Sequence, residues 1–117
     1  MKHVSYKVAK AIKEAGFPQD VTPYQYVTKD YSTFKEGEVI DSFFQCAAGD
    51  NVIDMPSVLE AWLWLWREKQ IIIKVTGCCC FIEINGVLKS GIPDKEPEEM
   101  IAKNIEWLVQ KGWIRKL

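Results

Sequence analysis

The chain lacks most of the residue patterns that mark a reaction centre. Its only histidine, His3, lies beside the first methionine in a segment expected to fray, which makes it a poor general base or metal ligand. The seven glycines are scattered, and no glycine-rich phosphate-binding loop is present. The four cysteines, Cys46 and the run from Cys78 to Cys80, have no C-x-x-C spacing. We therefore predict no metal site, no cofactor and no enzymatic activity.

An excess of charge and a long apolar run are also missing. The 117 residues include 15 basic and 16 acidic side chains, so the electrostatic footprint of most nucleic-acid-binding proteins is absent. The runs AWLWLW and CCCFI are far shorter than a membrane span, and the N-terminal residues do not form the apolar core of a signal peptide. These features predict a soluble, cytoplasmic protein with reduced thiols and no membrane partner, and they disfavour nucleic acid as a partner.

The remaining composition is that of a folded domain with three helices. Hydrophobic residues make up 48% and charged residues 26% of the chain, close to the globular average, so we predict one domain spanning residues 1–117. Ser5 is a typical N-cap residue and Gly16 a typical residue just after a helix, while Pro56 and Pro97 suit the first helical position. The predicted helices cover residues 6–15, from 56 to about 69, and from 97 to about 112.

Short strands account for most of the other residues. Alternation over residues 24–28 and the run VIDSFF at 39–44 favour two strands, and the residues from Cys46 to Asn51 favour a loop. IIIKV, CCCFIEI and VLK favour two strands and an optional third, with Asn85-Gly86 typical of a tight hairpin turn. The order α-β-β-α-β-β-(β)-α predicts the α+β class, with an antiparallel sheet of about four strands and the helices mainly on one face.

The cysteine run is interpreted as part of this core. Side chains alternate in a strand, so Cys78 and Cys80 are expected on one face and Cys79 on the other, together with Phe81 and Glu83. Free cysteines usually behave as small hydrophobic residues, which predicts a packing role for the three thiols. The face with Glu83 is predicted to meet solvent.

Two tryptophans lie outside the apolar stripes of their predicted helices. On a helical wheel the stripe of the second helix centres on Trp62 and includes Trp66, whereas Trp64 falls on the opposite side among charged residues. Trp107 likewise points away from the stripe of the last helix. Because large exposed apolar side chains often mark interfaces, Trp64 and Trp107 are candidates for an interaction surface. The alternative is that other parts of the chain cover both rings.

Tyr24 and Tyr26 offer a second candidate surface. They alternate along a predicted strand, and Phe43 lies on its predicted neighbour, so the rings could form a base-stacking face like that of RNA-binding modules. The balanced charge argues against this interpretation, and alternating aromatic residues more often pack beneath a helix.

Several segments together are similar to a known group of proteins. The matches are Lys13–Phe17 (KEAGF) at the end of the first helix, Pro56, Arg67–Lys69 (REK) followed by an isoleucine run, and Pro97–Glu99 (PEE). In this pattern the chain resembles small uncharacterised proteins encoded by bacteriophages, prophages and mobile elements of gut anaerobes. It departs from them in its tryptophan-rich helix, its cysteine run, and Trp66 where leucine is expected. The resemblance implies a fold and an origin, and no activity.

The preferred function is therefore a non-enzymatic protein-interaction module from a phage or mobile element, with a homodimer as the simplest assembly. The alternative is a nucleic-acid-binding accessory protein that uses the strand of Tyr24 and Tyr26.

Overall fold

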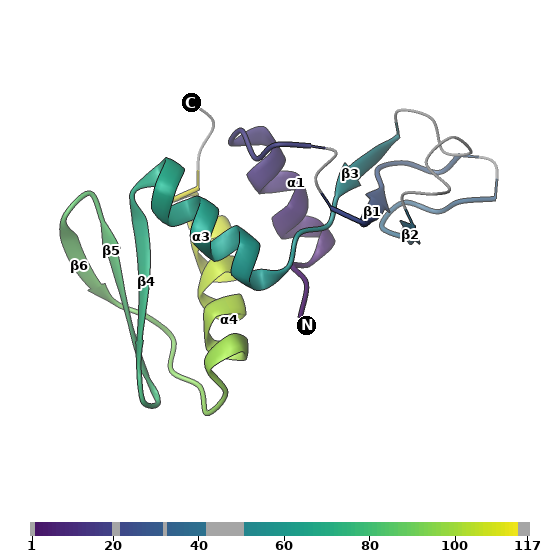
Figure 1. Cartoon of the computed structure of the whole chain (residues 1–117). Coiled ribbons are helices and arrows are strands. Elements are labelled where there is room, and N and C mark those ends of the chain that lie inside the picture. The colour runs from purple at the N-terminus through teal and green to yellow at the C-terminus, as the bar shows by residue number, and fades with distance from the viewer. Residues whose placement is uncertain (1, 20–21, 32, 42–50, 115–117) are drawn as a thin grey trace.

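The computed structural model describes residues 2–19, 22–31, 33–41 and 51–114, and these form an α+β fold (Figure 1). Its elements in chain order are α1 (Tyr6–Glu14), β1 (Tyr24–Val27), β2 (Val39–Asp41), β3 (Val52–Asp54), α3 (Val58–Lys69), β4 (Ile71–Thr76), β5 (Cys79–Ile84), β6 (Val87–Ser90) and α4 (Pro97–Gln110). The predicted class is confirmed. No helix among the described residues is long and apolar enough to cross a membrane.

The strands form two antiparallel sheets of three strands, where the sequence had predicted one sheet of about four. One sheet has the order β2-β1-β3 and the other has the order β4-β5-β6. The difference arises from β3, which was not predicted and pairs with the second edge of β1, Tyr26 lying opposite Ile53. A strand of three residues offers too little alternation to be recognised from sequence. The predicted strand at 39–44 is present as β2 up to Asp41, and residues 42–50 lie outside the described part of the chain.

The second sheet follows the sequence prediction closely. Asn85 and Gly86 have φ angles of 51° and 82°, the positive values of a two-residue hairpin turn, and join Ile84 to its partner Val87. The optional third strand is present as β6. β5 begins at Cys79, so Cys78 belongs to the turn that precedes it. The cysteine run therefore starts one residue outside the sheet.

The helix ends show which local signals were decisive. Ser5 caps α1 by accepting a hydrogen bond from the Val8 backbone N–H, as predicted. α3 begins later than predicted: Ser57 and Glu60 form a reciprocal capping box, so Pro56 lies before the helix and is not its first residue. α4 begins at Pro97 and ends close to Gly112, both as predicted.

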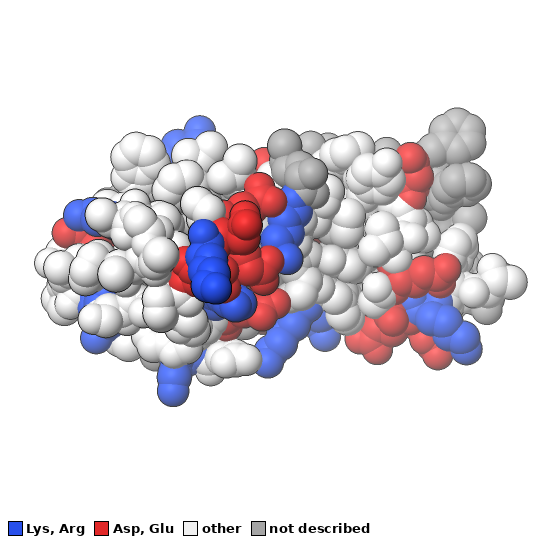
Figure 2. All heavy atoms as spheres, turned by 90° about the horizontal axis from the view of Figure 1, so that it is seen from below, with Lys and Arg blue, Asp and Glu red and all other residues white. Residues whose placement is uncertain are grey.

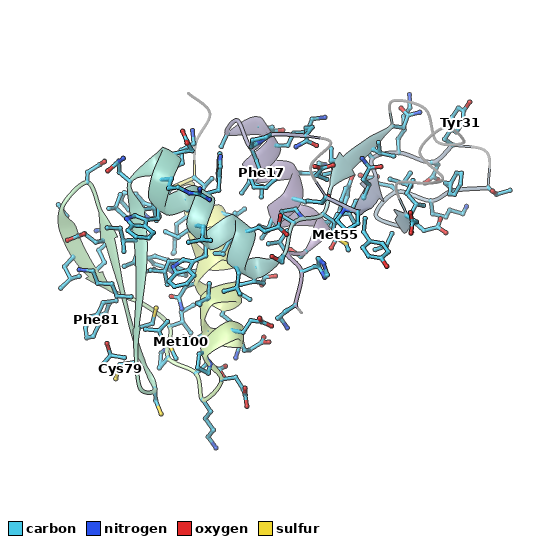
Figure 3. All side chains as sticks on the ribbon, in the orientation of Figure 1. Phe17, Tyr31, Met55, Cys79, Phe81 and Met100 are labelled. Carbon is cyan, nitrogen blue, oxygen red and sulfur yellow. The ribbon has the colours of Figure 1, made fainter. Side chains whose placement is uncertain are left out.

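The helices lie between the two sheets in the elongated molecule, which measures 45 × 31 × 21 Å (Figure 1). α3 and α4 pack on the β4–β6 sheet, and α1 contacts both α4 and β3. Met100 of α4 lies between its helix and the sheet, where it is fully buried (Figure 3). One hydrophobic cluster includes residues of α1, β3, α3, β4, β5 and α4, so the core is continuous along most of the molecule.

The N-terminal segment is held in place, contrary to the expectation that it frays. The Val4 N–H donates to the Pro56 carbonyl at 3.1 Å, and the Val58 N–H donates to the Lys2 carbonyl at 2.9 Å. These bonds tie the start of the chain to the start of α3. His3 therefore occupies a defined position, half-buried beside the ring of Tyr24.

Candidate interaction groove beside β4

The orientation of α3 differs from the predicted one. Trp64 is only 7% exposed and packs edge-to-face against Phe17, with ring centroids 5.4 Å apart. Trp66, which was predicted to face the core, is 53% exposed. Of the two alternatives given for Trp64, burial by another part of the chain is the one observed, so its ring is not an exposed interaction surface.

The error has a physical cause in the composition of α3. Apolar residues occur on every side of α3, so a helical wheel does not identify a single apolar face. The face that is buried in the structure lies roughly a quarter turn from Trp62. The side chains that define this face are Val58, Ala61, Trp64 and Leu65. The helix can bury two sides because it is enclosed by the β4–β6 sheet on one side and by Phe17, after α1, on the other.

The rotation of α3 places two tryptophans beside the edge strand β4. A hollow of about 570 Å³ lies there, more than twice the volume of the hollow between α1 and α4. We call it the β4 groove. It is lined by Trp62 and Trp66 of α3, Ile72, Ile73, Lys74 and Val75 of β4, and Pro97 and Ile101 of α4. Seven of these eight described lining residues are apolar, which is typical of a binding cleft.

A specific hydrogen bond fixes one wall of the β4 groove. The indole N–H of Trp62 donates to the backbone carbonyl of Ile73 at 3.0 Å. Because the bond uses the only polar atom of the indole, the remainder of the ring is free to act as an apolar wall. Trp66 lies one helical turn further along α3 and forms the exposed rim. The groove is thus a preformed feature of the packed α3–β4 pair.

The opposite face of the β4–β6 sheet points away from the helices. Phe81 and Cys79 lie on this face (Figure 3), and Phe81 is 38% exposed. Glu83 is half-buried there and forms an ion pair with Lys74 at 3.9 Å. The predicted partition of Cys79, Phe81 and Glu83 onto one face is confirmed. The surface mixes apolar and charged side chains and has no concave shape among the hollows described.

The three described cysteines have different environments, which corrects the prediction that all three pack in the core. Cys80 is buried, and burial raises the pKa of its thiol. Cys78 and Cys79 are exposed at the β4–β5 turn. Cys46 lies outside the described residues. Within the described ranges, no group of three histidine, cysteine or acidic side chains is placed to hold a metal ion.

The tyrosines of β1 do not form an open aromatic face. Tyr26 is buried beneath α1: its hydroxyl donates to the Val4 carbonyl, its ring packs on Tyr6, and burial raises its pKa. Tyr24 is 42% exposed, so it is the one ring of the predicted pair that meets solvent. The predicted third member, Phe43, lies outside the described residues. Because Tyr26 is buried, Tyr24 is the only described ring left of the proposed base-stacking face.

Trp107 is neither fully exposed, as an interaction surface would require, nor fully covered by other parts of the chain. Its ring is partly buried and packs against the main hydrophobic cluster. It therefore contributes to the core from the edge of α4, and it does not stand out from the surface as Trp66 does. Of the four residues predicted as candidate surfaces, Tyr24 is the one with an exposed side chain.

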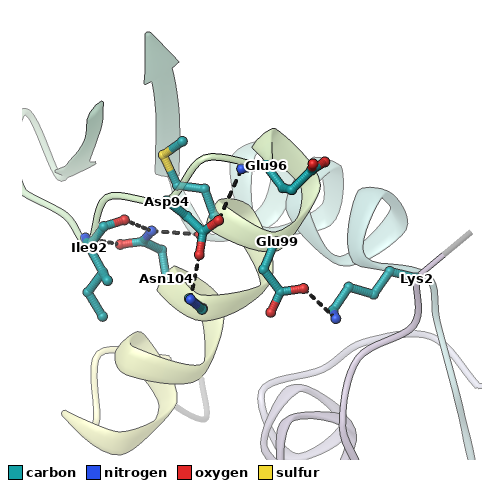
Figure 4. A network of polar contacts seen from close by, with 8 residues as sticks. Lys2, Ile92, Asp94, Glu96, Glu99 and Asn104 are labelled. Atoms are coloured by element: carbon teal, nitrogen blue, oxygen red, sulfur yellow. Dashed lines mark hydrogen bonds and ion pairs between the residues drawn. The ribbon is translucent and has the colours of Figure 1, made fainter. Parts of the chain in front are cut away.

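Charged side chains of both signs lie together around the N-terminal end of α4 (Figure 2). Lys2 pairs with Glu99, and Asp94 pairs with Lys103 (Figure 4). The hydrogen bond from the backbone N–H of Glu96 is the largest cause of the lowered pKa of the Asp94 carboxyl. The hydrogen bond from Lys103 is the second largest cause. These contacts neutralise one another locally, so this face carries no separate basic stripe of the kind that binds a nucleic-acid backbone.

Asp54 is buried and has a structural role. Its side chain accepts hydrogen bonds from the Thr22 N–H and from the Gln25 amide, both at 3.2 Å. These two hydrogen bonds join β3 to β1 and to the segment that precedes β1.

Comparisons with models of protein families, with curated proteins and with solved structures find no match. The resemblance to phage and mobile-element proteins accordingly stays a prediction.

Proposed function

We propose that this protein is a non-enzymatic protein-interaction module and that its contact surface is the β4 groove. The observation that carries the proposal is the exposed ring of Trp66 at the rim of an apolar hollow. Tryptophan is enriched at the energetic centres of interfaces because its large rigid ring buries much apolar area at a small cost in conformational entropy. The two candidate occupants are a foreign protein and a second copy of the chain.

The experiment compares the wild type with two variants that each place a glutamate on the surface. Trp66→Glu puts a charge at the rim of the groove, while Leu88→Glu puts one on β6, at the other edge of the same sheet, where Leu88 is 59% exposed. Neither residue is buried, so both variants should fold with little change in stability. Circular dichroism melts check this point.

Two binding measurements then follow. The solution mass, from light scattering after size exclusion, detects self-association, and selection from a displayed library of protein fragments detects foreign partners. We expect association in at least one of them that Trp66→Glu abolishes and Leu88→Glu preserves. A monomeric wild type that selects no fragment, or association that both variants retain, would refute the proposal.

A further inference from the structure

The outer side of α3 carries a row of exposed apolar side chains. Leu59, Leu63 and Trp66 are each more than a third exposed. Their spacing of four and three residues places them on one face of the helix, and we call this row the α3 stripe. Figure 1 shows α3 in front of α4, at the outside of the helix layer. The α3 stripe adjoins the β4 groove, because Trp66 belongs to both.

Two charged residues of opposite sign lie along one flank of the α3 stripe. Glu60 and Arg67 are both exposed, and their separation of about two helical turns places them on the same side of the helix. Glu60 accepts a hydrogen bond from the Ser57 N–H, and a guanidinium N–H of Arg67 donates to the Leu63 carbonyl at 3.5 Å. Within the described part of the chain, neither charge forms an ion pair. Both charges can therefore pair with charges on another molecule.

We propose that the α3 stripe binds the α3 stripe of a second copy of this chain, with the two helices antiparallel about a two-fold axis. This proposal rests on the proposed function above and specifies its partner. In an antiparallel pair the charges on a shared flank meet in reverse order, so Glu60 of each copy faces Arg67 of the other. In a parallel pair identical residues lie level with one another, which would leave these opposite charges about 10 Å apart along the helix axis. The charges therefore favour the antiparallel arrangement.

The apolar residues fit the same register without adjustment. When Glu60 lies level with Arg67 of the second copy, each step forward along one helix is a step back along the other. Trp66 then lies level with Ala61 of the second copy, midway between the positions of its Leu59 and Leu63. Each indole ring therefore enters the space between two leucines of the facing helix, as a knob enters a hole in a coiled coil. The charges and the apolar side chains thus independently indicate one register.

The length of α3 limits the strength of this dimer. The helix has 12 residues. It is therefore about 18 Å long, and the contact is smaller than a standard protein–protein interface. We expect a dissociation constant on the order of micromolar, with the dimer in equilibrium with the monomer.

The test measures the dissociation constant of the full chain by analytical ultracentrifugation, over about 1 to 500 μM. Arg67→Glu places like charges opposite each other at both ends of the contact and should weaken association about tenfold. The double variant Glu60→Lys, Arg67→Glu exchanges the two charges and should return the dissociation constant to within about threefold of the wild type. Because Glu60→Lys also removes the glutamate of the capping box, melting curves check that the double variant is folded.

Cross-linking supplies a second readout that leaves both charges and the capping box unchanged. In the proposed register Leu63 lies beside the two-fold axis and close to its own counterpart, whereas the two copies of Leu59 lie about 14 Å apart along the helix axis. A short bis-maleimide should therefore join Leu63→Cys into a covalent dimer and should not join Leu59→Cys. Both variants also carry serine in place of every native cysteine except the buried Cys80.

The outcomes separate this proposal from the proposed function. Self-association that Trp66→Glu abolishes, but in which Leu59→Cys cross-links as readily as Leu63→Cys, would overturn the antiparallel register and leave the proposed function intact. Self-association that Arg67→Glu leaves unchanged would do the same. A wild type that is monomeric at every concentration but selects protein fragments in a Trp66-dependent manner would overturn the second copy as the partner. A monomeric wild type that selects no fragment would refute both.

Discussion

Replacing Asn104 with alanine should lower the free energy of unfolding by about 2 to 3 kcal/mol. Asn104 lies on α4, is fully buried, and holds the segment that connects β6 to α4 (Figure 4). Its side-chain oxygen accepts from the Ile92 N–H at 2.8 Å. Its amide nitrogen donates to the Ile92 carbonyl at 2.9 Å and to the Met100 carbonyl at 2.7 Å. The side chain thus satisfies both backbone groups of one loop residue.

The magnitude follows from these three bonds. Each contributes about 1 kcal/mol net, and a buried group left without a partner costs about 1 to 3 kcal/mol. Ile92 is 37% exposed, so water can reach its backbone groups after the amide is removed, which favours the lower end of the range. Alanine also has a higher helix propensity than asparagine, which stabilises the variant by about 0.5 kcal/mol. For a domain of this size the loss corresponds to a fall of roughly 10 °C in Tm.

Urea unfolding followed by tryptophan fluorescence and circular dichroism measures the effect. The matched control is Gln110→Ala, which removes an exposed amide from the last residue of the same helix. It should change stability by less than about 0.5 kcal/mol. If Asn104→Ala is no less stable than this control, the hydrogen bonds of Asn104 do not stabilise the fold as argued.

The Asn104→Asp variant tests the same buried site through the pH dependence of its stability. A buried carboxylate facing the carbonyl oxygens of Ile92 and Met100 has a raised pKa, because its charged form is desolvated and repelled. The folded state then binds a proton that the unfolded state releases near pH 4, so the variant gains stability as the pH falls through the raised pKa. A stability difference from the wild type that does not narrow on acidification would contradict the burial of this site.

Two further predictions concern the surface. The pKa of Asp94 is lowered from 3.8, so its contribution to stability is present above that value and is lost as the pH falls through the lower, folded-state pKa. The difference in urea midpoint between wild type and Asp94→Asn should therefore be constant near neutral pH and vanish in strong acid, and a difference that persists there would contradict the assignment. Alkylation of the native protein, mapped by mass spectrometry, should label Cys78 and Cys79 quickly and Cys80 only after unfolding. Labelling of Cys80 at the same rate would show that the hairpin opens locally.

The parts of the fold that could be predicted from sequence are those set by a local signal. Ser5 and Gly16 delimit the first helix because capping depends on a few neighbouring backbone groups. Asn85 and Gly86 determine the β5–β6 turn because its positive φ angles are costly for other residues. The start of α3 was also encoded locally, in the pair Ser57 and Glu60, and the prediction missed it by giving priority to Pro56.

The candidate site could be predicted only in part. An exposed tryptophan on α3 was expected, but the exposed one is Trp66, because the helix is apolar on all sides and its neighbours determine which side is buried. The groove itself has no sequence motif, since its walls come from α3, β4 and α4. Which backbone groups of β4 lie on the side away from β5 depends on the register of the β4–β5 pair.

The amino-acid sequence by itself determined the α+β class, the helix ends and the hairpin turns, because these follow from the conformational preferences of adjacent residues. The tertiary structure alone decided the division into two sheets, the rotation of α3 and the position of β4 at the edge of its sheet. Each of these depends on contacts between residues distant in the chain, as when β3 pairs with β1 across the segment at 28–51 and Phe17 covers Trp64. Such contacts compete with alternatives of similar local free energy, and only the packing of the whole molecule selects among them.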